Sequence, residues 1–299
     1  MAEAVSQPNV TYAAPKRHSA LAMFCLAQPL GAISGVAILI MLFGGVFADF
    51  VAPYDPLAID FSAMLAPPSW EHWMGTDAFG RDIFSRVIFG ARTALTIGFF
   101  ASLMGCVSGA MIGVASAYFG GRIDMIVQRF IDVMLSFPII VLALVVVAML
   151  GRNQIGGIDI NLVFAIAIPI VPKVARVVRS AALSIREMPY IDAARAAGFG
   201  HIRIILRHMV PNVAAPFLIM FTAFIAQAIL LEASLSFLGL GVTEPTPAWG
   251  LMLSGNASDF YREAPWMILF PGLAISVAVF AFNLFGDSLR DWLDPKFKV

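Results

Sequence analysis

The sequence contains little charge for its length. Only 13% of its 299 residues are Asp, Glu, Lys or Arg, whereas 60% are hydrophobic and the mean hydropathy is +0.87. Soluble domains carry about 25% charged residues and cover their cores with them, so an ordinary soluble enzyme, a disordered chain and a disulfide-stapled secreted domain are excluded. A basic surplus is also missing, because 19 basic and 19 acidic residues cancel, which argues against nucleic acid as a partner. The composition therefore predicts an integral membrane protein.

Cysteine and catalytic motifs are scarce as well. The two cysteines, Cys25 and Cys106, lie in long apolar runs and are predicted to be buried hydrophobic side chains rather than a disulfide or a metal pair. The chain has no phosphate-binding loop, no H-E-x-x-H zinc helix and no G-x-S-x-G nucleophile motif. His201 and His208 stand among basic residues without a nearby carboxylate or thiol, which favours a solvated basic face over a metal site. We expect no catalytic residue, no metal and no cofactor bound by this chain, and no enzyme activity of its own.

What the chain does contain is a series of charge-free stretches. They run over residues 19–48, 93–121, 133–151, 160–172, 208–231 and 264–286. A helix needs about 20 apolar residues to cross the hydrocarbon of a bilayer, and five of the stretches meet or nearly meet this length. None alternates polar and apolar residues as a membrane barrel strand would, so the spans are predicted to be helices.

The basic residues decide whether the short stretch 160–172 also crosses. If six helices cross and the N-terminus is cytoplasmic, 14 basic residues lie inside and 5 outside, as the positive-inside rule requires. Without that crossing, the seven basic residues from Lys173 to Arg207 would fall outside. We therefore predict an all-α integral membrane protein with six transmembrane helices and cytoplasmic N and C termini. The short helix is expected to continue into the cytosol through Lys173, Arg176 and Arg179.

This topology divides the chain into three parts. Residues 1–18 form a cytoplasmic tail, and residues 19–92 form the first transmembrane helix and a long external loop. The first charge-free stretch far exceeds the 7–15 apolar residues of a cleavable signal, so it is expected to stay as an anchor. Residues 93–299 form a core of five transmembrane helices, and they include a cytoplasmic loop at about 188–211.

The second stretch carries small residues at strict four-residue spacing: Ala101, Gly105, Gly109, Gly113 and Ala117. On a helix these residues form a groove that lets a neighbouring backbone approach closely. We expect this groove to be a helix-packing surface, with a substrate path along it as the alternative.

Ionisable and polar groups at membrane depth are candidates for the translocation path. Glu232, with Gln227 before it, lies toward the outer end of the fifth stretch. Either these side chains line a polar cavity, or they bond neighbouring helices. Asp132 follows Arg129 at helical spacing, which predicts a local ion pair.

The cytoplasmic segment Pro189-Tyr190-Ile191-Asp192-Ala193-Ala194-Arg195-Ala196-Ala197-Gly198 is the most informative part of the loop. Its alanines favour a helix, Pro189 suits the first turn, and Gly198 is a natural stop. The face of this helix carries few large side chains, so the cleft of another protein could close tightly around it. An amphipathic helix lying on lipid is the alternative.

This segment resembles the EAA loop of the permeases of ATP-binding cassette importers, whose pattern is E-A-A-x-x-x-G, nine residues, then I-x-L-P. Asp192, Ala193, Ala194, Gly198 and Pro211 fall in register. The chain departs from the pattern with Asp192 for Glu, His208 for Ile and Val210 for Leu.

Three further segments resemble the C-type permeases of dipeptide and oligopeptide importers, whose relatives also carry nickel or glutathione. These segments are Gly75-Thr76-Asp77 with Gly80-Arg81-Asp82, Ser85-Arg86 and Gly90-Ala91-Arg92; Ala233 to Gly241 with Pro245, Pro247, Trp249 and Gly250; and Phe282 to Pro295. Several motifs in the same order make this a specific resemblance over most of the chain.

The resemblance implies a type I importer permease fold in the inner (cytoplasmic) membrane of a bacterial cell, forming half of a translocation path for a peptide-like solute. It implies as partners a homologous second permease, two cytosolic ATPases that use ATP and Mg, an extracytoplasmic solute-binding protein and membrane lipid. It assigns ATPase coupling to the loop residues Asp192, Ala193, Ala194, Arg195, Gly198 and Pro211.

Two questions stay open at this point. The charged residues Asp77, Arg81, Asp82 and Arg86 of the external loop either hold the fold of that loop or meet the binding protein. A stand-alone secondary transporter or channel is the other functional class. Such a carrier has discontinuous helices and inverted repeats; the chain shows no such symmetry, although Pro169 and Pro172 are expected to break the fourth stretch.

Overall fold

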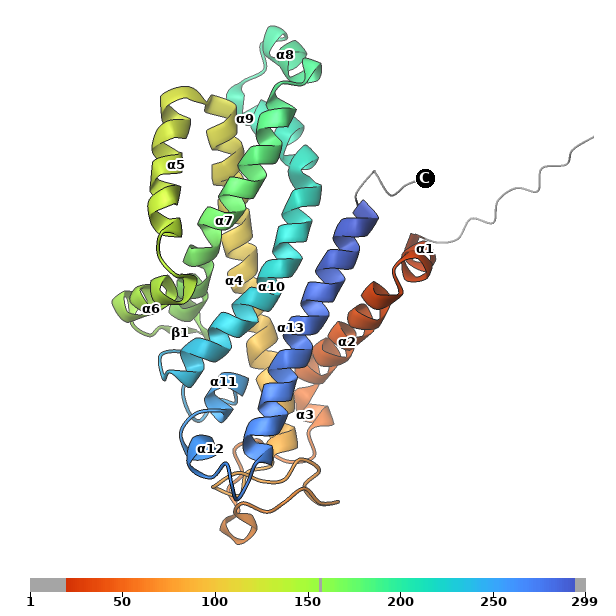
Figure 1. The fold of residues 1–299 in the computed structure, drawn as a ribbon, viewed down its shortest axis with the longest axis vertical. Coiled ribbons are helices and arrows are strands. Elements are labelled where there is room, and N and C mark those ends of the chain that lie inside the picture. The colour runs from red at the N-terminus through yellow and green to blue at the C-terminus, as the bar shows by residue number, and fades with distance from the viewer. Residues whose placement is uncertain (1–19, 156–157, 294–299) are drawn as a thin grey trace, which may run out of the picture.

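The computed structural model describes residues 20–155 and 158–293, and it is almost entirely helical. Five of its helices are long and apolar enough to cross a membrane. They are α2 (Pro29–Val46), α4 (Ile83–Phe119), α7 (Ile160–Arg186), the run His201–Phe237 that ends in α10 (Ala214–Phe237), and α13 (Trp266–Leu293) (Figure 1). The expected tail over residues 1–18 lies outside the described residues. The helical membrane fold is thereby confirmed, whereas the number of crossings and the side of the termini stay predictions.

The third predicted span, residues 133–151, is wrong as a single straight helix. The chain forms α5 (Gly121–Leu135) and α6 (Ile139–Leu150), bent by 95° at the break between them. Pro138 is the last residue of this break; it has no N–H to donate and disfavours helical geometry at Phe137 before it. The described chain reaches six crossings only if this bent pair counts as one. A short antiparallel hairpin follows, with β1 (Gln154–Ile155) paired to β2 (Ile158–Asp159).

The fourth stretch is longer than its charge-free core, as expected. α7 continues from Ile160 through Arg176 and Arg179 to Arg186 as one helix. The expectation that Pro169 and Pro172 break it is wrong, because both are buried inside the continuous helix. Close packing of α4 along α7 offsets the backbone hydrogen bonds that each proline removes.

The remaining short elements gather at the two ends of the bundle (Figure 1). One end, here called the α8 end, carries α8 (Pro189–Ala196) and α9 (His201–Ile204), and α1 (Ala20–Ala27) and the end of α13 point the same way. The opposite end, here called the loop end, carries α3 (Ala48–Val51), η1 (Phe61–Ala63), α11 (Trp249–Met252) and α12 (Asn256–Asp259). The predicted cytoplasmic loop and the predicted external loops therefore lie at opposite ends of the molecule.

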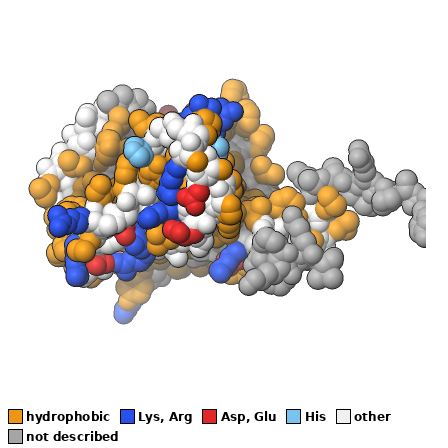
Figure 2. All heavy atoms as spheres, turned by 90° about the horizontal axis from the view of Figure 1, so that it is seen from above, with side chains coloured by type: hydrophobic (Ala, Val, Ile, Leu, Met, Phe, Trp, Pro, Cys, Tyr) orange, Lys and Arg blue, Asp and Glu red, His pale blue; other side chains and the backbone are white. Residues whose placement is uncertain are grey.

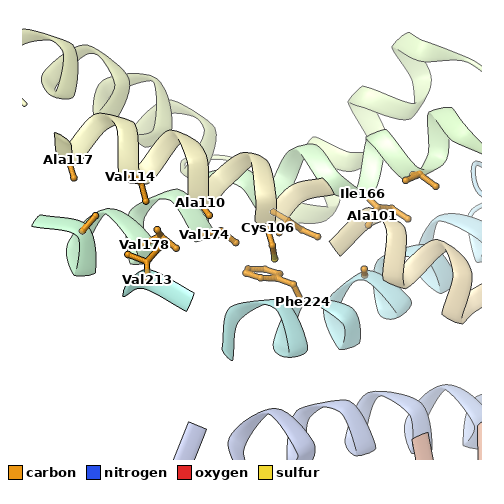
Figure 3. Close-up of a cluster of buried hydrophobic side chains, with 14 of the residues drawn as sticks. Ala101, Cys106, Ala110, Val114, Ala117, Ile166, Val174, Val178, Val213 and Phe224 are labelled. Carbon is orange, nitrogen blue, oxygen red and sulfur yellow. The ribbon is translucent and has the colours of Figure 1, made fainter. Parts of the chain in front are cut away.

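The core is built on the contact between α4 and α7. A Cβ placed on Gly105, Gly109 or Gly113 would lie 2.5–2.8 Å from a backbone carbonyl of α7, so only glycine permits this approach. The small-residue groove is thus a packing surface, as predicted. Figure 3 shows Cys106, Ala110 and Val114 of α4 beside Val174 and Val178 of α7, with Phe224 of α10 completing the cluster. Cys106 is buried as expected, but the prediction for Cys25 is wrong, because it is exposed on α1 at the edge of the bundle.

Candidate coupling segment and loop-end charge cluster

The predicted helix of the cytoplasmic loop is present as α8. Pro189 occupies its first turn, where the missing N–H is not needed, and Met188 precedes it in extended geometry. Asp192 accepts a hydrogen bond from Arg195 at 3.0 Å on the solvent side. Gly198 follows the helix with φ +75°, a left-handed conformation that side chains disfavour. The local sequence thus fixes both ends of this helix.

The two alanines of the motif face different surroundings. Ala193 is exposed, together with Asp192, Arg195, Gly198 and Pro211. Ala194, by contrast, is only 6% exposed and packs with Ile191 against the core of the bundle. The spacing of Ile191 and Ala194 is one helical turn, so both side chains turn inward. A partner that grips α8 would therefore contact Ala193 rather than Ala194.

The segment between α8 and α10 is irregular. After α9 the chain forms a π-helical turn, η2 (Ile205–Met209), and a 3₁₀ turn, η3 (Val210–Val213). Pro211 cannot donate the backbone hydrogen bond that a regular helix requires at this point, and such turns take up the mismatch. Pro211, which falls in register with the motif, thus lies where the chain changes from a π-helical turn to a 3₁₀ turn.

The two histidines of this segment do not share one solvated face. The Nδ1 atom of His201 lies 2.8 Å from the hydroxyl of Tyr118, whereas His208 stacks on Phe199 and its Nε2 atom is buried. The expected basic face is therefore wrong for His208. Over residues 20–155 and 158–293, no group of three or more His, Cys, Asp or Glu side chains is placed to hold a metal ion.

Figure 2 shows the molecule from the α8 end, where Lys and Arg side chains lie among hydrophobic ones with a few acidic groups between them. Exposed residues of this part of the chain include Lys173, Arg176, Arg195, Arg203 and Arg207. Asp132 contacts Arg176 of α7, so the predicted pair with Arg129 is wrong. The polar side of α5 is turned toward α7, which brings Asp132 to a partner on another helix.

Three of the four predicted charges of the external loop, Asp77, Arg81 and Arg86, form one cluster at the loop end, and Asp82 lies beside it at the start of α4. Its carboxylate accepts the backbone N–H of Ser85 at 2.8 Å and the hydroxyl of Ser85 at 2.7 Å, which caps the helix. The other carboxylate oxygen of Asp82 lies 3.0 Å from Nδ1 of His72. Asp82 thus ties the loop to the first turn of α4.

The cluster itself joins Asp77 to two arginines. Arg81 donates to Asp77 at 2.6 Å and to Glu244 at 3.0 Å. The buried guanidinium of Arg86 lies 3.8 Å from Asp77 and 3.5 Å from Glu244, and it donates to the carbonyl of Pro56. Burial alone would lower the pKa of Arg81, but the hydrogen bonds and charges of Glu244 and Asp77 outweigh burial and raise it. All four predicted residues therefore hold the fold of this loop.

Glu244 is the residue of this cluster that the sequence did not suggest. It lies 163 positions from Arg81, between α10 and α11, and no local spacing connects the two. A cavity of about 430 Å³ opens beside the cluster and is bordered by Asp77, Arg81, Arg86 and Glu244. Glu244 is half exposed, so this carboxylate is the part of the cluster that another molecule could reach.

Glu232 and Gln227 on α10 differ in burial and in hydrogen bonding. Glu232 is completely buried, and its Oε1 accepts the hydroxyl of Ser236 at 2.7 Å. Ser236 in turn accepts the backbone N–H of Val242 at 3.0 Å. Gln227 is half-buried one and a half turns earlier. Glu232 therefore bonds within α10, to the hydroxyl that holds the following loop, rather than to a neighbouring long helix. Its role in a translocation path stays a prediction.

Comparison with known proteins identifies the family. The family model described as "binding-protein-dependent transport system inner membrane component" matches residues 109–299. The chain belongs to this family. The dipeptide transport system permease protein DppC of Alkalihalophilus pseudofirmus is 45% identical over 253 residues, which cover 85% of this chain and 81% of the relative. The glutathione transport system permease protein GsiD of Escherichia coli is 41% identical over 272 residues, which cover 91% of this chain and 88% of the relative.

A solved structure of the MetNI methionine ABC transporter in an inward-facing conformation has the same fold. Its TM-score is 0.54 at 17% identity, and the match covers 71% of this chain and 98% of the solved chain. The predicted resemblance to the permeases of ATP-binding cassette importers is thus confirmed. The family makes this chain a multi-pass inner-membrane protein and one component of a larger transport system. It also decides against a stand-alone secondary transporter.

Proposed function

We propose that this chain is a permease subunit of an ATP-driven importer, in which it forms half of the translocation path for a peptide-like solute. The observation that carries the proposal is the position of α8. This helix stands at the end of the bundle opposite to the charged loop cluster (Figure 1), and its exposed Ala193 leaves room for a partner that packs closely. Coupling to a cytosolic ATPase would then pass through residues 188–211, with the termini and this loop in the cytoplasm.

The proposed cargo is a short peptide. Two relatives are named dipeptide and di/tripeptide permeases, and the di/tripeptide protein of Pseudomonas aeruginosa is 38% identical over 300 residues, which cover 98% of this chain. Glutathione, itself a tripeptide derivative, is the second candidate because the GsiD relatives are named for it. Nickel is the third alternative and rests on the resemblance of the motifs alone.

The proposed partners are a homologous permease, two ATPases and an extracytoplasmic solute-binding protein, all within lipid. ATP and Mg would be used by the ATPases, since this chain has no phosphate-binding loop. Glu244, with Arg81 and Arg86 behind it, would lie at the mouth that faces the binding protein. These charges would then have two roles: they hold the fold of the loop, and they contact the binding protein.

Uptake measured in vesicles tests the proposal. The complete importer would be reconstituted with ATP inside, and labelled dipeptide, glutathione and nickel would be offered with the binding protein outside. We expect ATP-dependent accumulation of the dipeptide and none when both partner ATPases carry a substitution that stops hydrolysis. Uptake that persists with inactive ATPases would refute the importer, and uptake of glutathione or nickel in place of the dipeptide would correct the cargo.

A further inference from the structure

Three helices of the bundle meet next to α8, although only two of them are joined to it by the chain. α7 leads into α8 and α9 leads out of it, whereas α4 ends beside them at Phe119. The penultimate residue of α4, Tyr118, is 6% exposed. Its hydroxyl lies 2.8 Å from Nδ1 of His201, the first residue of α9. The guanidinium of Arg195, in the last turn of α8, lies 5.5 Å above the ring of Tyr118.

α4 is also fixed to α7 along its length. The glycine groove brings the two backbones together, and Arg186 at the end of α7 donates to the carbonyl of Ala117 at 3.0 Å. α4 and α7 therefore form one packed unit, and the bond between Tyr118 and His201 links that unit to the start of α9.

The path along the chain from α8 to α10 is less regular than the packed contact between α4 and α7. It runs through the π-helical and 3₁₀ turns between Ile205 and Val213, whose hydrogen-bond geometry is poorer than that of an α-helix. These turns are irregular in backbone geometry, although Ile205, Met209 and Val213 bury their side chains in the core formed with α4 and α7. The contact at Tyr118 bypasses them, because it lies on the α8 side of the irregular turns and leads directly into a helix of 37 residues.

We propose that Tyr118 is a positioning residue for ATPase coupling: its hydrogen bond to His201 locks α8 and α9 to α4, so that movement of α8 moves α4. The other end of α4 carries Ser85 and Arg86 in the loop-end cluster. α4 thereby connects the coupling segment to the opposite mouth of the molecule. This inference rests on the proposed function of the loop 188–211.

The test is a set of variants in the reconstituted importer, with uptake and binding-protein-stimulated ATP hydrolysis as readouts. Tyr118→Phe removes one hydroxyl and keeps the ring. We expect uptake per ATP hydrolysed to fall about fivefold, the factor that corresponds to ~1 kcal/mol for one hydrogen bond, at unchanged complex abundance and basal ATPase rate. Tyr54→Phe is the matched control, because its hydroxyl bonds the carbonyl of Glu71 in the loop at the far end, and it should leave coupling unchanged.

Changes at His201 separate positioning from general stability. His201→Asn keeps a polar atom near the place of Nδ1 and should retain most of the coupling, whereas His201→Phe should lose it. In the Tyr118→Phe background the two should become equal, because the bond that distinguishes them is gone. Normal coupling in Tyr118→Phe, or loss in proportion to complex abundance, would overturn the inference.

One further variant separates this inference from the proposed function. Gly198→Leu places a large side chain at φ +75° in the coupling loop and should abolish coupling if the loop contacts an ATPase. If Gly198→Leu stops coupling and Tyr118→Phe does not, only the role of Tyr118 is wrong. If Gly198→Leu couples normally, the proposed function of the loop fails.

Discussion

Arg86 and Arg92 lie within the first ten residues of α4, yet their surroundings differ. The side chain of Arg86 is 2% exposed between Asp77 and Glu244, and that of Arg92 is 39% exposed beside Asp49. Removing one member of a buried charge pair leaves the other charge without compensation, whereas an exposed pair is screened by water. Burial therefore decides which of the two arginines matters for stability.

We predict that Arg86→Leu destabilises the protein strongly and that Arg92→Leu does not. Removal of a partner from a buried pair costs about 3–5 kcal/mol when the other charge is left unpaired. Because Arg81 still pairs with Asp77 and Glu244 after Arg86→Leu, we expect a loss at the lower end of this range. The measurement is the thermal unfolding midpoint of the purified complex in detergent. Equal midpoints for the two variants would show that the cluster does not hold the loop.

The sequence placed Asp77, Arg81, Asp82 and Arg86 together because they are close along the chain. It could not indicate Glu244, whose approach depends on how the segment after α10 folds back over α4. The same limit applies to Ala194: the motif marks it as part of the loop, but its burial depends on the core beneath α8. Local spacing reveals which residues matter, and tertiary packing decides which way they face.

Among the helices, α4 and α7 pack most closely where the glycines of α4 lie against the backbone of α7. A Cβ on Gly109 would lie 2.7 Å from the carbonyl of Val171 and 2.8 Å from Cβ of Val174. The four-residue spacing of small residues made this contact predictable from the sequence, because the spacing marks one face of a helix. The break between α5 and α6 was harder to predict from the sequence, because the stretch 133–151 is uniformly charge-free. Pro138 alone does not determine the angle between the two helices.

We predict that Gly109→Ala lowers stability and that Gly272→Ala does not. In both positions, replacing Gly by Ala raises the intrinsic stability of the helix by roughly 1 kcal/mol. The difference in stability between the two variants therefore measures the effect of packing alone. Nothing lies within 4 Å of a Cβ on Gly272, whereas overpacking at Gly109 costs about 1–3 kcal/mol. Unfolding midpoints in the same detergent provide the comparison. A midpoint for Gly109→Ala at or above that of Gly272→Ala would contradict the tight contact.

At the scale of the whole molecule, the two ends have different chemistry. The α8 end has exposed basic side chains and a short helix, α8, whose exposed side includes the small residue Ala193 (Figure 2). The loop end has a largely buried cluster of charges beside a cavity. α4 runs between the two ends, and α7 packs along the part of α4 nearer the α8 end. The charge-free stretches predicted the long helices, and the basic residues predicted which loops share an end. Neither could reveal the contact between Tyr118 and His201, which joins α4 to the segment at the α8 end.

The proposed role of α8 is to transmit force from an ATPase to the membrane helices, and a bulky side chain at the exposed Ala193 would obstruct it. The measurement is the initial rate of ATP-driven dipeptide uptake by vesicles that contain the complete importer with Ala193→Trp, and with Ala193→Ser as the matched control. A cleft that closes on α8 has no room for an indole, so Ala193→Trp should abolish uptake and the stimulation of ATP hydrolysis by the binding protein, while the permease stays inserted. Ala193→Ser should transport normally. Full uptake with Ala193→Trp would show that no partner closes on α8.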